Sequence, residues 1–225
     1  MNRTVIIMAK VPRAGNVKTR LQPFLSADRC RTLAEAFLCD AINKARNLCD
    51  RLIIAFAPAS EKDYFADVQI ENLTLIEQRG ADLGEKMSDA FEFAFRRNSD
   101  ASVVLIGTDS PTFPPQYIEK ALANLKSEAQ TVLGKSVDGG FYLIGLRSNP
   151  PRLFENIEWS SPFVYRQMTR NIKELELPSA LLPEWFDVDE PDDLRRLREE
   201  VLNDARVQKI APHTFRWLTA NADSF

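Results

Sequence analysis

The sequence contains one histidine, His213, and only three cysteines among its 225 residues. A single histidine excludes a zinc site with several imidazole ligands, and a serine–histidine–aspartate triad would depend entirely on that residue. We expect His213 to have an ordinary surface or packing role. The cysteines, Cys30, Cys39 and Cys49, lack the paired spacing of a metal site and fall in one predicted helical region. An odd number without a secretory signal favours a reducing compartment, so we expect a cytoplasmic protein.

Long apolar runs are also absent. The run at Thr4–Ala9 is too short for a signal-peptide core, and no stretch approaches the roughly 18 apolar residues of a membrane span. The net charge of −3 argues against a protein that binds nucleic acid nonspecifically. Residues 1–27 nevertheless contain five cations and no acidic residue: Arg3, Lys10, Arg13, Lys18 and Arg20. This local excess of positive charge indicates a small anionic partner.

Short apolar runs alternate with segments of helical periodicity. Strands are predicted at residues 4–9, 51–58, 73–78, 102–107, 131–136 and 141–146, and helices at residues 26–47, 61–66, 84–97, 114–126, 163–173 and 190–203. Repeated strand–helix units predict one α/β domain whose mostly parallel sheet carries helices on both faces. In such a sheet ligands bind beyond the carboxyl ends of the strands, so the residues that follow each strand are the candidates for chemistry.

The segment Lys10–Arg20 follows the first predicted strand and combines four cations with one glycine, Gly15. Arginine can bind phosphate in a bidentate manner, lysine contributes a point charge, and glycine allows the backbone to approach closely. The spacing matches neither a Walker loop nor the Rossmann glycine pattern. A phosphate-binding loop is the preferred interpretation, and a solvated basic loop is the alternative.

Two acidic segments are candidates for a metal site. Asp109 lies where the central predicted strand ends, and magnesium usually takes one or two protein carboxylates. An ordinary turn at Asp109 is the alternative. Alternation in a short strand would place Asp187 and Asp189 on the same face, where two carboxylates repel unless a cation relieves them. Alternatively, Asp189 or Glu190 caps the helix that begins near Pro191.

Two glycine-containing turns complete the candidates. The segment Gln78–Gly84 could let a flat base approach the backbone, and Asp138-Gly139-Gly140 could do the same for an acceptor. Ordinary turns are the alternative interpretation for both segments.

Five segments in this order resemble one known family: MAKVPRAGNVKTRL, QRGADLGEKMSDAF, LIGTDSPTF, DGGFYLIGL and FDVDEPDDL. They are similar to the DUF2064 family, also called the rSAM/selenodomain-associated transferase 1 family, within the nucleotide-diphospho-sugar transferases of GT-A fold. The resemblance implies a single GT-A-like, Rossmann-like three-layer α/β/α sandwich over residues 1–225. Its motif-bearing core would cover about residues 5–195, and residues 205–225 would form a C-terminal extension.

The resemblance also implies roles for individual residues. Those of the nucleotide site would be the phosphate-loop residues Lys10, Arg13, Gly15, Lys18 and Arg20, with Gln78 and Gly84 near the base. Asp109 would be the principal metal ligand, Asp189 the second and Asp187 a weaker candidate, whereas Asp138, Gly139 and Gly140 would border the acceptor. Two positions depart from the family pattern, because Glu190 replaces the usual threonine and Lys135 occupies a place often held by proline.

Together these features predict a transferase that depends on Mg²⁺ or Mn²⁺, with Lys18, Arg20 and Asp109 as catalytic residues. Its partners would be a nucleoside triphosphate or nucleotide-sugar donor and a small-molecule acceptor, not nucleic acid or membrane. Glycosyl transfer is the preferred interpretation. The alternatives are nucleotidyl transfer to a phosphorylated small molecule, as in 2-phospholactate guanylyltransferase, and a nucleotide-binding regulatory protein without turnover.

Overall fold

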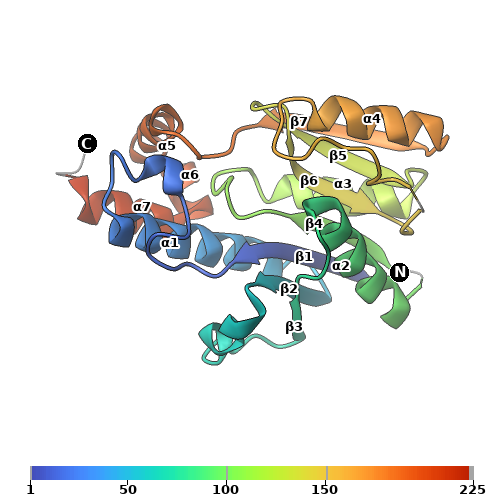
Figure 1. Cartoon of the computed structure of the whole chain (residues 1–225), viewed down its shortest axis with the longest axis horizontal. Coiled ribbons are helices and arrows are strands. Elements are labelled where there is room, and N and C mark those ends of the chain that lie inside the picture. The colour runs from blue at the N-terminus through green and yellow to red at the C-terminus, as the bar shows by residue number, and fades with distance from the viewer. Residues whose placement is uncertain (1, 100, 151, 223–225) are drawn as a thin grey trace.

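The apolar runs pair into one sheet in the computed structural model, which describes residues 2–99, 101–150 and 152–222 (Figure 1). Within these residues the sheet has seven strands in the order β3-β2-β1-β4-β6-β5-β7. They are β1 (Arg3–Lys10), β2 (Arg51–Ala57), β3 (Leu73–Glu77), β4 (Ser102–Ile106), β5 (Thr131–Ser136), β6 (Phe141–Leu146) and β7 (Ser179–Trp185). Only β6 runs antiparallel to its neighbours. The predicted α/β fold with a mostly parallel sheet is confirmed.

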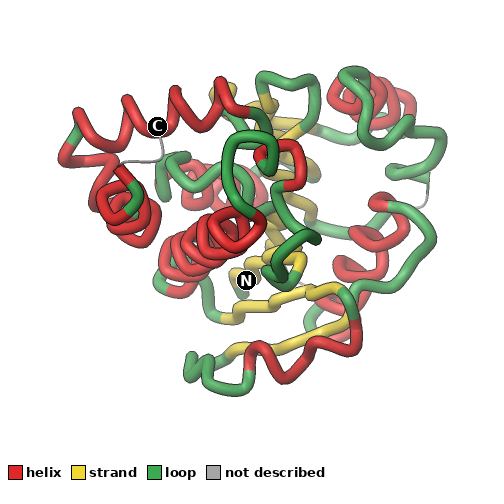
Figure 2. The backbone as a smooth tube through the Cα atoms, turned by 60° about the vertical axis from the view of Figure 1, so that its left-hand side comes forward, coloured by secondary structure: helices red, strands yellow, loops and turns green. Residues whose placement is uncertain are grey.

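Helices cover both faces of the sheet, which makes three layers (Figure 2). Alternate residues of β1 point to opposite faces. Val5 and Ile7 join the core cluster under α1 (Ala27–Arg46) and α3 (Gln116–Lys126). Ile6 joins the cluster under α2 (Leu83–Arg97) and α4 (Val164–Glu174). Burial on both faces explains why the central strands read as continuous apolar runs rather than alternating ones.

Three helices at the carboxyl end of the described chain pack on the outer side of α1 (Figure 1). They are α5 (Pro191–Asn203), α6 (Ala205–Ile210) and α7 (Pro212–Ala220). Trp217 and Leu218 of α7 are buried against α1. Asp40 of α1 is fully buried and accepts hydrogen bonds from the backbone N–H groups of His213 and Thr214. Residues 223–225 of the predicted C-terminal extension lie outside the described part.

The ends of the predicted helices depend on side chains that bind free backbone groups. The Ser26 side chain accepts a hydrogen bond from the N–H of Arg29, as expected of the residue that caps α1. Glu190 and Asp193 form a reciprocal capping box at the start of α5, and Pro191 occupies its first turn. Asp189 is therefore not needed as the cap of this helix.

Several sequence-based predictions were wrong in detail. The helix predicted at residues 61–66 is a 3₁₀ segment, η2 (Ala59–Phe65), and another short 3₁₀ segment, η1 (Thr19–Leu21), interrupts the basic loop. Cys49 lies beyond the end of α1. Strand β7 was missed because Pro183 weakens its strand pattern, although a proline is tolerated on this edge strand. Residues 186–189 follow β7 as irregular chain, so the predicted short strand there is absent.

No helix in the described ranges has both the length and the apolar composition needed to cross a bilayer.

Candidate active site

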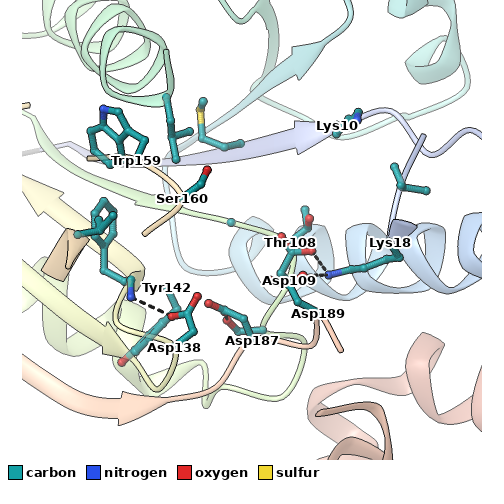
Figure 3. Close-up of a pocket in the computed structure, with 18 of the residues that line it drawn as sticks. Lys10, Lys18, Thr108, Asp109, Asp138, Tyr142, Trp159, Ser160, Asp187 and Asp189 are labelled. Carbon is teal, nitrogen blue, oxygen red and sulfur yellow. Dashed lines mark hydrogen bonds and ion pairs between the residues drawn. The ribbon is translucent and has the colours of Figure 1, made fainter. Parts of the chain in front are cut away.

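A cavity of about 780 Å³ opens at the carboxyl ends of the parallel strands (Figure 3). Its lining comes from the loops that follow β1, β3 and β4, from the β5–β6 turn, from residues 159–162 and from the segment after β7. Because β6 is antiparallel to both β4 and β5, β5 runs in the same direction as β4 and also ends at this edge, where the β5–β6 turn borders the cavity. This is the edge at which an open α/β sheet places its ligands.

Lys18 links the two carboxylates expected to hold a metal ion. Its ammonium group forms ion pairs with Asp109 and with Asp189, the latter at 3.0 Å, and donates a hydrogen bond to the Val188 carbonyl oxygen at 2.7 Å (Figure 3). The Lys18 side chain is only 5% exposed, whereas those of Asp109 and Asp189 are 49% and 43% exposed. Burial by itself lowers the pKa of Lys18, but the two carboxylates outweigh it, so this pKa is raised.

The backbone holds the two carboxylates close together. Asp109 follows β4, and its carbonyl oxygen accepts a hydrogen bond of 2.9 Å from the N–H of Val188 in the segment after β7. Lys18 itself adopts the left-handed conformation, with φ of 48°, which is uncommon for a residue with a side chain. Residues far apart in the sequence therefore converge on one ammonium group.

Asp187 is oriented differently from Asp189. Its two oxygens accept hydrogen bonds from the hydroxyl groups of Ser110 and, at 2.5 Å, Ser136. Burial raises the pKa of Asp187 to about 6, although the two hydroxyl groups act in the opposite direction. The prediction that Asp187 and Asp189 share one face of a strand is wrong, because no strand forms there. Asp187 ties the loop after β4 to the end of β5.

A divalent cation fits the Asp109–Asp189 pair on the side that faces the cavity. Each carboxylate is about half exposed, and Mg²⁺ commonly uses one or two protein carboxylates while water and phosphate oxygens fill its other positions. In the described part of the chain no group of three or more His, Cys, Asp or Glu side chains forms a complete metal cage. The donor set therefore suits an ion that shares its ligands with a phosphate.

The basic loop divides into residues that line the cavity and residues that do not. Lys10 lines it and donates a hydrogen bond to the Asn16 carbonyl oxygen at 2.6 Å. Arg20 also lines it, is 67% exposed and forms an ion pair of 3.7 Å with the exposed Glu190. Arg13 instead forms an ion pair of 2.6 Å with Glu61, and Gly15, with φ of +83°, lies in open space. Only Lys10 and Arg20 of this loop thus offer exposed positive charge to the cavity.

The predicted base site is partly covered by an aromatic ring. Gln78 lines the cavity, and its amide nitrogen donates to the carbonyl oxygens of Ala9 and Ala55. A methyl group added at Gly84 would lie 2.7 Å from the Trp159 ring. Because Gly84 has no side chain, the Trp159 indole can pack against its backbone. The indole covers the backbone surface that the sequence predicts for a base. Trp159 was not among the predicted site residues, because it lies in an irregular segment without a recognisable motif.

The end of the cavity away from the basic loop is bordered by the β5–β6 turn. Asp138 and Gly140 line it, and an oxygen of Asp138 accepts a hydrogen bond of 2.9 Å from the N–H of Gly140. Gly139, with φ of +93°, does not line the cavity, and any side chain there would collide with the Pro162 backbone. Lys135 points elsewhere and pairs with Glu184 at 2.5 Å. Among the described lining residues this end carries carboxylates and no cation.

A buried lysine of α1 donates a hydrogen bond to the loop that carries Asp109. Lys44 of α1 donates a hydrogen bond of 2.9 Å to the Pro111 carbonyl oxygen and lies 3.5 Å from the centre of the Phe113 ring. Burial lowers the pKa of Lys44 to about 7, and the charge of Asp40, one helical turn earlier, acts in the opposite direction. Helix α1 therefore connects α7, through Asp40, with the loop that carries Asp109.

The chain is similar to one protein family and to solved structures. Residues 41–161 match the family described as "Uncharacterized protein conserved in bacteria (DUF2064)". A candidate nucleotide-diphospho-sugar transferase from Desulfovibrio desulfuricans G20 shares 30% identity, with a TM-score of 0.89 over 99% of this chain and 96% of that one. No curated protein matches the chain by sequence.

More distant structures share the fold alone. The inositol-1-phosphate CTP transferase from T. maritima superimposes with a TM-score of 0.51 and 14% identity, over 95% of this chain and 96% of that one. The 4-diphosphocytidyl-2C-methyl-D-erythritol synthase from Anaerococcus prevotii DSM 20548 gives a TM-score of 0.56 and 10% identity, over 87% and 95%.

Proposed function

The chain belongs to the DUF2064 family, and on this premise we propose that it is a divalent-metal-dependent transferase that moves a sugar from a nucleotide donor to an uncharged acceptor. Lys10 and Arg20 would bind the donor phosphates, and Asp109 and Asp189 would hold Mg²⁺ or Mn²⁺ against the same phosphates. When bound, the ion supplies charge neutralisation to the leaving group. Asp138 and Gly140 would border the acceptor.

The observation that supports sugar transfer is that, among the described lining residues, no cation lies at the β5–β6 end of the cavity. Its exposed cations, Lys10 and Arg20, lie at the end of β1 and on the loop after it, whereas Asp138 and Asp187 lie toward the β5–β6 turn. An acceptor phosphate would need cations to offset its charge, because like charges in one site repel. A hydroxyl or amine acceptor can instead donate a hydrogen bond to a carboxylate. The acidic end therefore favours an uncharged or cationic acceptor.

The proposed reaction is a direct displacement at the anomeric carbon. An acceptor hydroxyl oxygen forms a bond to that carbon, while the bond from the carbon to the distal phosphate oxygen breaks and its electron pair leaves with the nucleoside diphosphate. The hydroxyl proton passes to Asp138 or to water. Arg20 and Lys10 stabilise the negative charge that the leaving group gains, and the fixed loops hold the two substrates in line.

Nucleotidyl transfer is the second candidate, because Lys10 and Arg20 would also suit a triphosphate. In addition, two structures of the same fold are named as a CTP transferase and as a 4-diphosphocytidyl-2C-methyl-D-erythritol synthase. The two reactions differ in their products. Nucleotidyl transfer releases pyrophosphate from a nucleoside triphosphate, whereas sugar transfer releases a nucleoside diphosphate from a nucleotide-sugar.

A substrate panel tests the proposal. The protein is incubated with Mn²⁺ and either nucleotide-sugars or nucleoside triphosphates, together with neutral or phosphorylated sugar acceptors, and the released phosphates are quantified. Nucleoside diphosphate release that depends on a neutral acceptor would support sugar transfer. Pyrophosphate release that depends on a phosphorylated acceptor would overturn it in favour of nucleotidyl transfer. A melting temperature that rises with donor and metal, without any product, would indicate a binding protein.

A further inference from the structure

We propose that Lys18 is a permanent internal cation of the metal site, which holds Asp109 and Asp189 together and keeps a free divalent ion weakly bound until donor phosphates arrive. This inference rests on the proposed metal-dependent function. It replaces the sequence-based expectation that Lys18 binds phosphate directly.

The hydrogen-bonding capacity of Lys18 supports this role. A lysine ammonium group has three N–H donors, and that of Lys18 has three acceptors: oxygens of Asp109 and Asp189 and the carbonyl of Val188. A phosphate could be contacted only if one of these interactions were lost. At 5% exposure the side chain also presents almost no surface to the cavity.

The surroundings of Lys18 keep it in place behind the carboxylates. Its ammonium lies 5.4 Å from the centre of the Phe37 ring, on the side of α1. Its backbone adopts the less common left-handed conformation, with φ of 48°. Asp109 and Asp189 keep about half of their surface toward solvent, so an ion can approach them from the cavity while Lys18 stays behind.

The charge balance then determines how a metal ion binds. Two carboxylates and one ammonium leave a net charge of −1, instead of the −2 that the carboxylates alone would offer. A divalent ion next to this group gains less attraction and is repelled by Lys18. Diphosphate oxygens add negative charge on the open side of the ion and complete its coordination. The metal is therefore expected to bind together with the phosphates.

The effect of removing Lys18 follows from Coulomb's law. If the Lys18 ammonium and a divalent ion lie about 4 Å apart and are screened as in bulk water, their repulsion weakens metal binding by roughly 30-fold. We use the screening of bulk water because the ion would lie beside carboxylates that are half exposed to solvent. Lys18→Met and Lys18→Gln should both bind Mn²⁺ about 30-fold more tightly than the wild type when no phosphate is present.

The experiment measures Mn²⁺ affinity by calorimetry and by the electron paramagnetic resonance of free Mn²⁺, with and without inorganic pyrophosphate as a base-independent probe. Pyrophosphate should strengthen Mn²⁺ binding strongly in the wild type and much less in the two Lys18 variants. Lys120→Met is the control, since Lys120 is an exposed lysine of α3 that does not line the cavity. Its Mn²⁺ affinity without pyrophosphate should stay within about threefold of the wild type.

The possible outcomes distinguish this inference from the proposed function. Equal or weaker Mn²⁺ binding by both Lys18 variants, with wild-type circular dichroism, would overturn the role of Lys18 and leave metal dependence intact. If the variants fold poorly, their melting temperatures should rise more with Mn²⁺ alone than that of the wild type, and the absence of such a rise would also overturn it. Failure of every form to bind Mn²⁺, even with pyrophosphate, would overturn both the metal site and this inference.

Discussion

Replacing Lys44 with methionine should alter how the stability of the protein depends on pH. Methionine keeps most of the apolar stem and removes the ammonium group, so the packing beneath Phe113 is largely retained. It also removes the hydrogen bond to the Pro111 carbonyl oxygen, which costs about 1–3 kcal/mol at every pH. The diagnostic quantity is therefore the change with pH in the difference between wild type and variant.

The direction in which this stability difference changes with pH follows from the direction of the Lys44 pKa shift. Burial lowers the pKa of Lys44 in the folded protein from 10.5 to about 7. Between these values the unfolded chain holds a proton that the folded protein has lost, so the stability of the wild type rises with pH relative to Lys44→Met. The slope approaches about 1.4 kcal/mol per pH unit, and the total change from pH 7 to pH 10 is about 4 kcal/mol. Below pH 7 the difference should be constant.

Urea unfolding between about pH 6 and pH 10 measures this difference, because other titrating groups contribute almost equally to both proteins. Lys120→Met provides the control, since Lys120 is an exposed residue on α3. Parallel stability curves for the wild type and Lys44→Met across this range would refute the reasoning, and so would an equal slope for Lys120→Met.

Three further substitutions, one of them with a control, test other parts of the molecule. Asp109→Asn should reduce turnover about 10²–10³-fold at saturating metal while the melting temperature stays near that of the wild type, and near-normal turnover would contradict its role. Gly84→Ala should cost about 1–3 kcal/mol in urea unfolding and change tryptophan fluorescence, because its methyl group would press on Trp159. Gly15→Ala, whose methyl group meets nothing within 4 Å, should leave the fluorescence unchanged. Asp40→Ala should cost at least about 2 kcal/mol and speed amide exchange in α7, and unchanged α7 protection would argue against this anchor.

The sheet was largely predictable because its central strands are buried on both faces. Continuous apolar runs such as Ser102–Ile106 have few alternatives to a central strand, and the turn at Asp138-Gly139-Gly140 indicated a hairpin. Edge strand β7 was not predictable in the same way. Its side chains are mostly exposed and it contains Pro183, so neither periodicity nor composition distinguishes it from a loop.

The location of the site was also predictable, whereas its internal contacts were not. Parallel strands bring their carboxyl ends to one edge, and Lys18 and Asp109 follow two strands that the sequence predicts, β1 and β4. Which anion the buried ammonium pairs with depends on distances of a few ångströms, which sequence spacing does not fix. Arg13 likewise has the residue type of a phosphate ligand, but Glu61 occupies its guanidinium group. The functional roles of these residues stay predictions until the variants are measured.

The Lys18–Asp189 ion pair joins residues that are 171 positions apart in the chain. During synthesis the amino-terminal strands can begin to associate long before the segment after β7 has left the ribosome. Before Asp189 has been synthesised, the nascent chain has only one of the two carboxylates, Asp109, and the Lys18 ammonium lacks its second partner. The candidate site can therefore be assembled only after the segment that carries Asp189 has been synthesised.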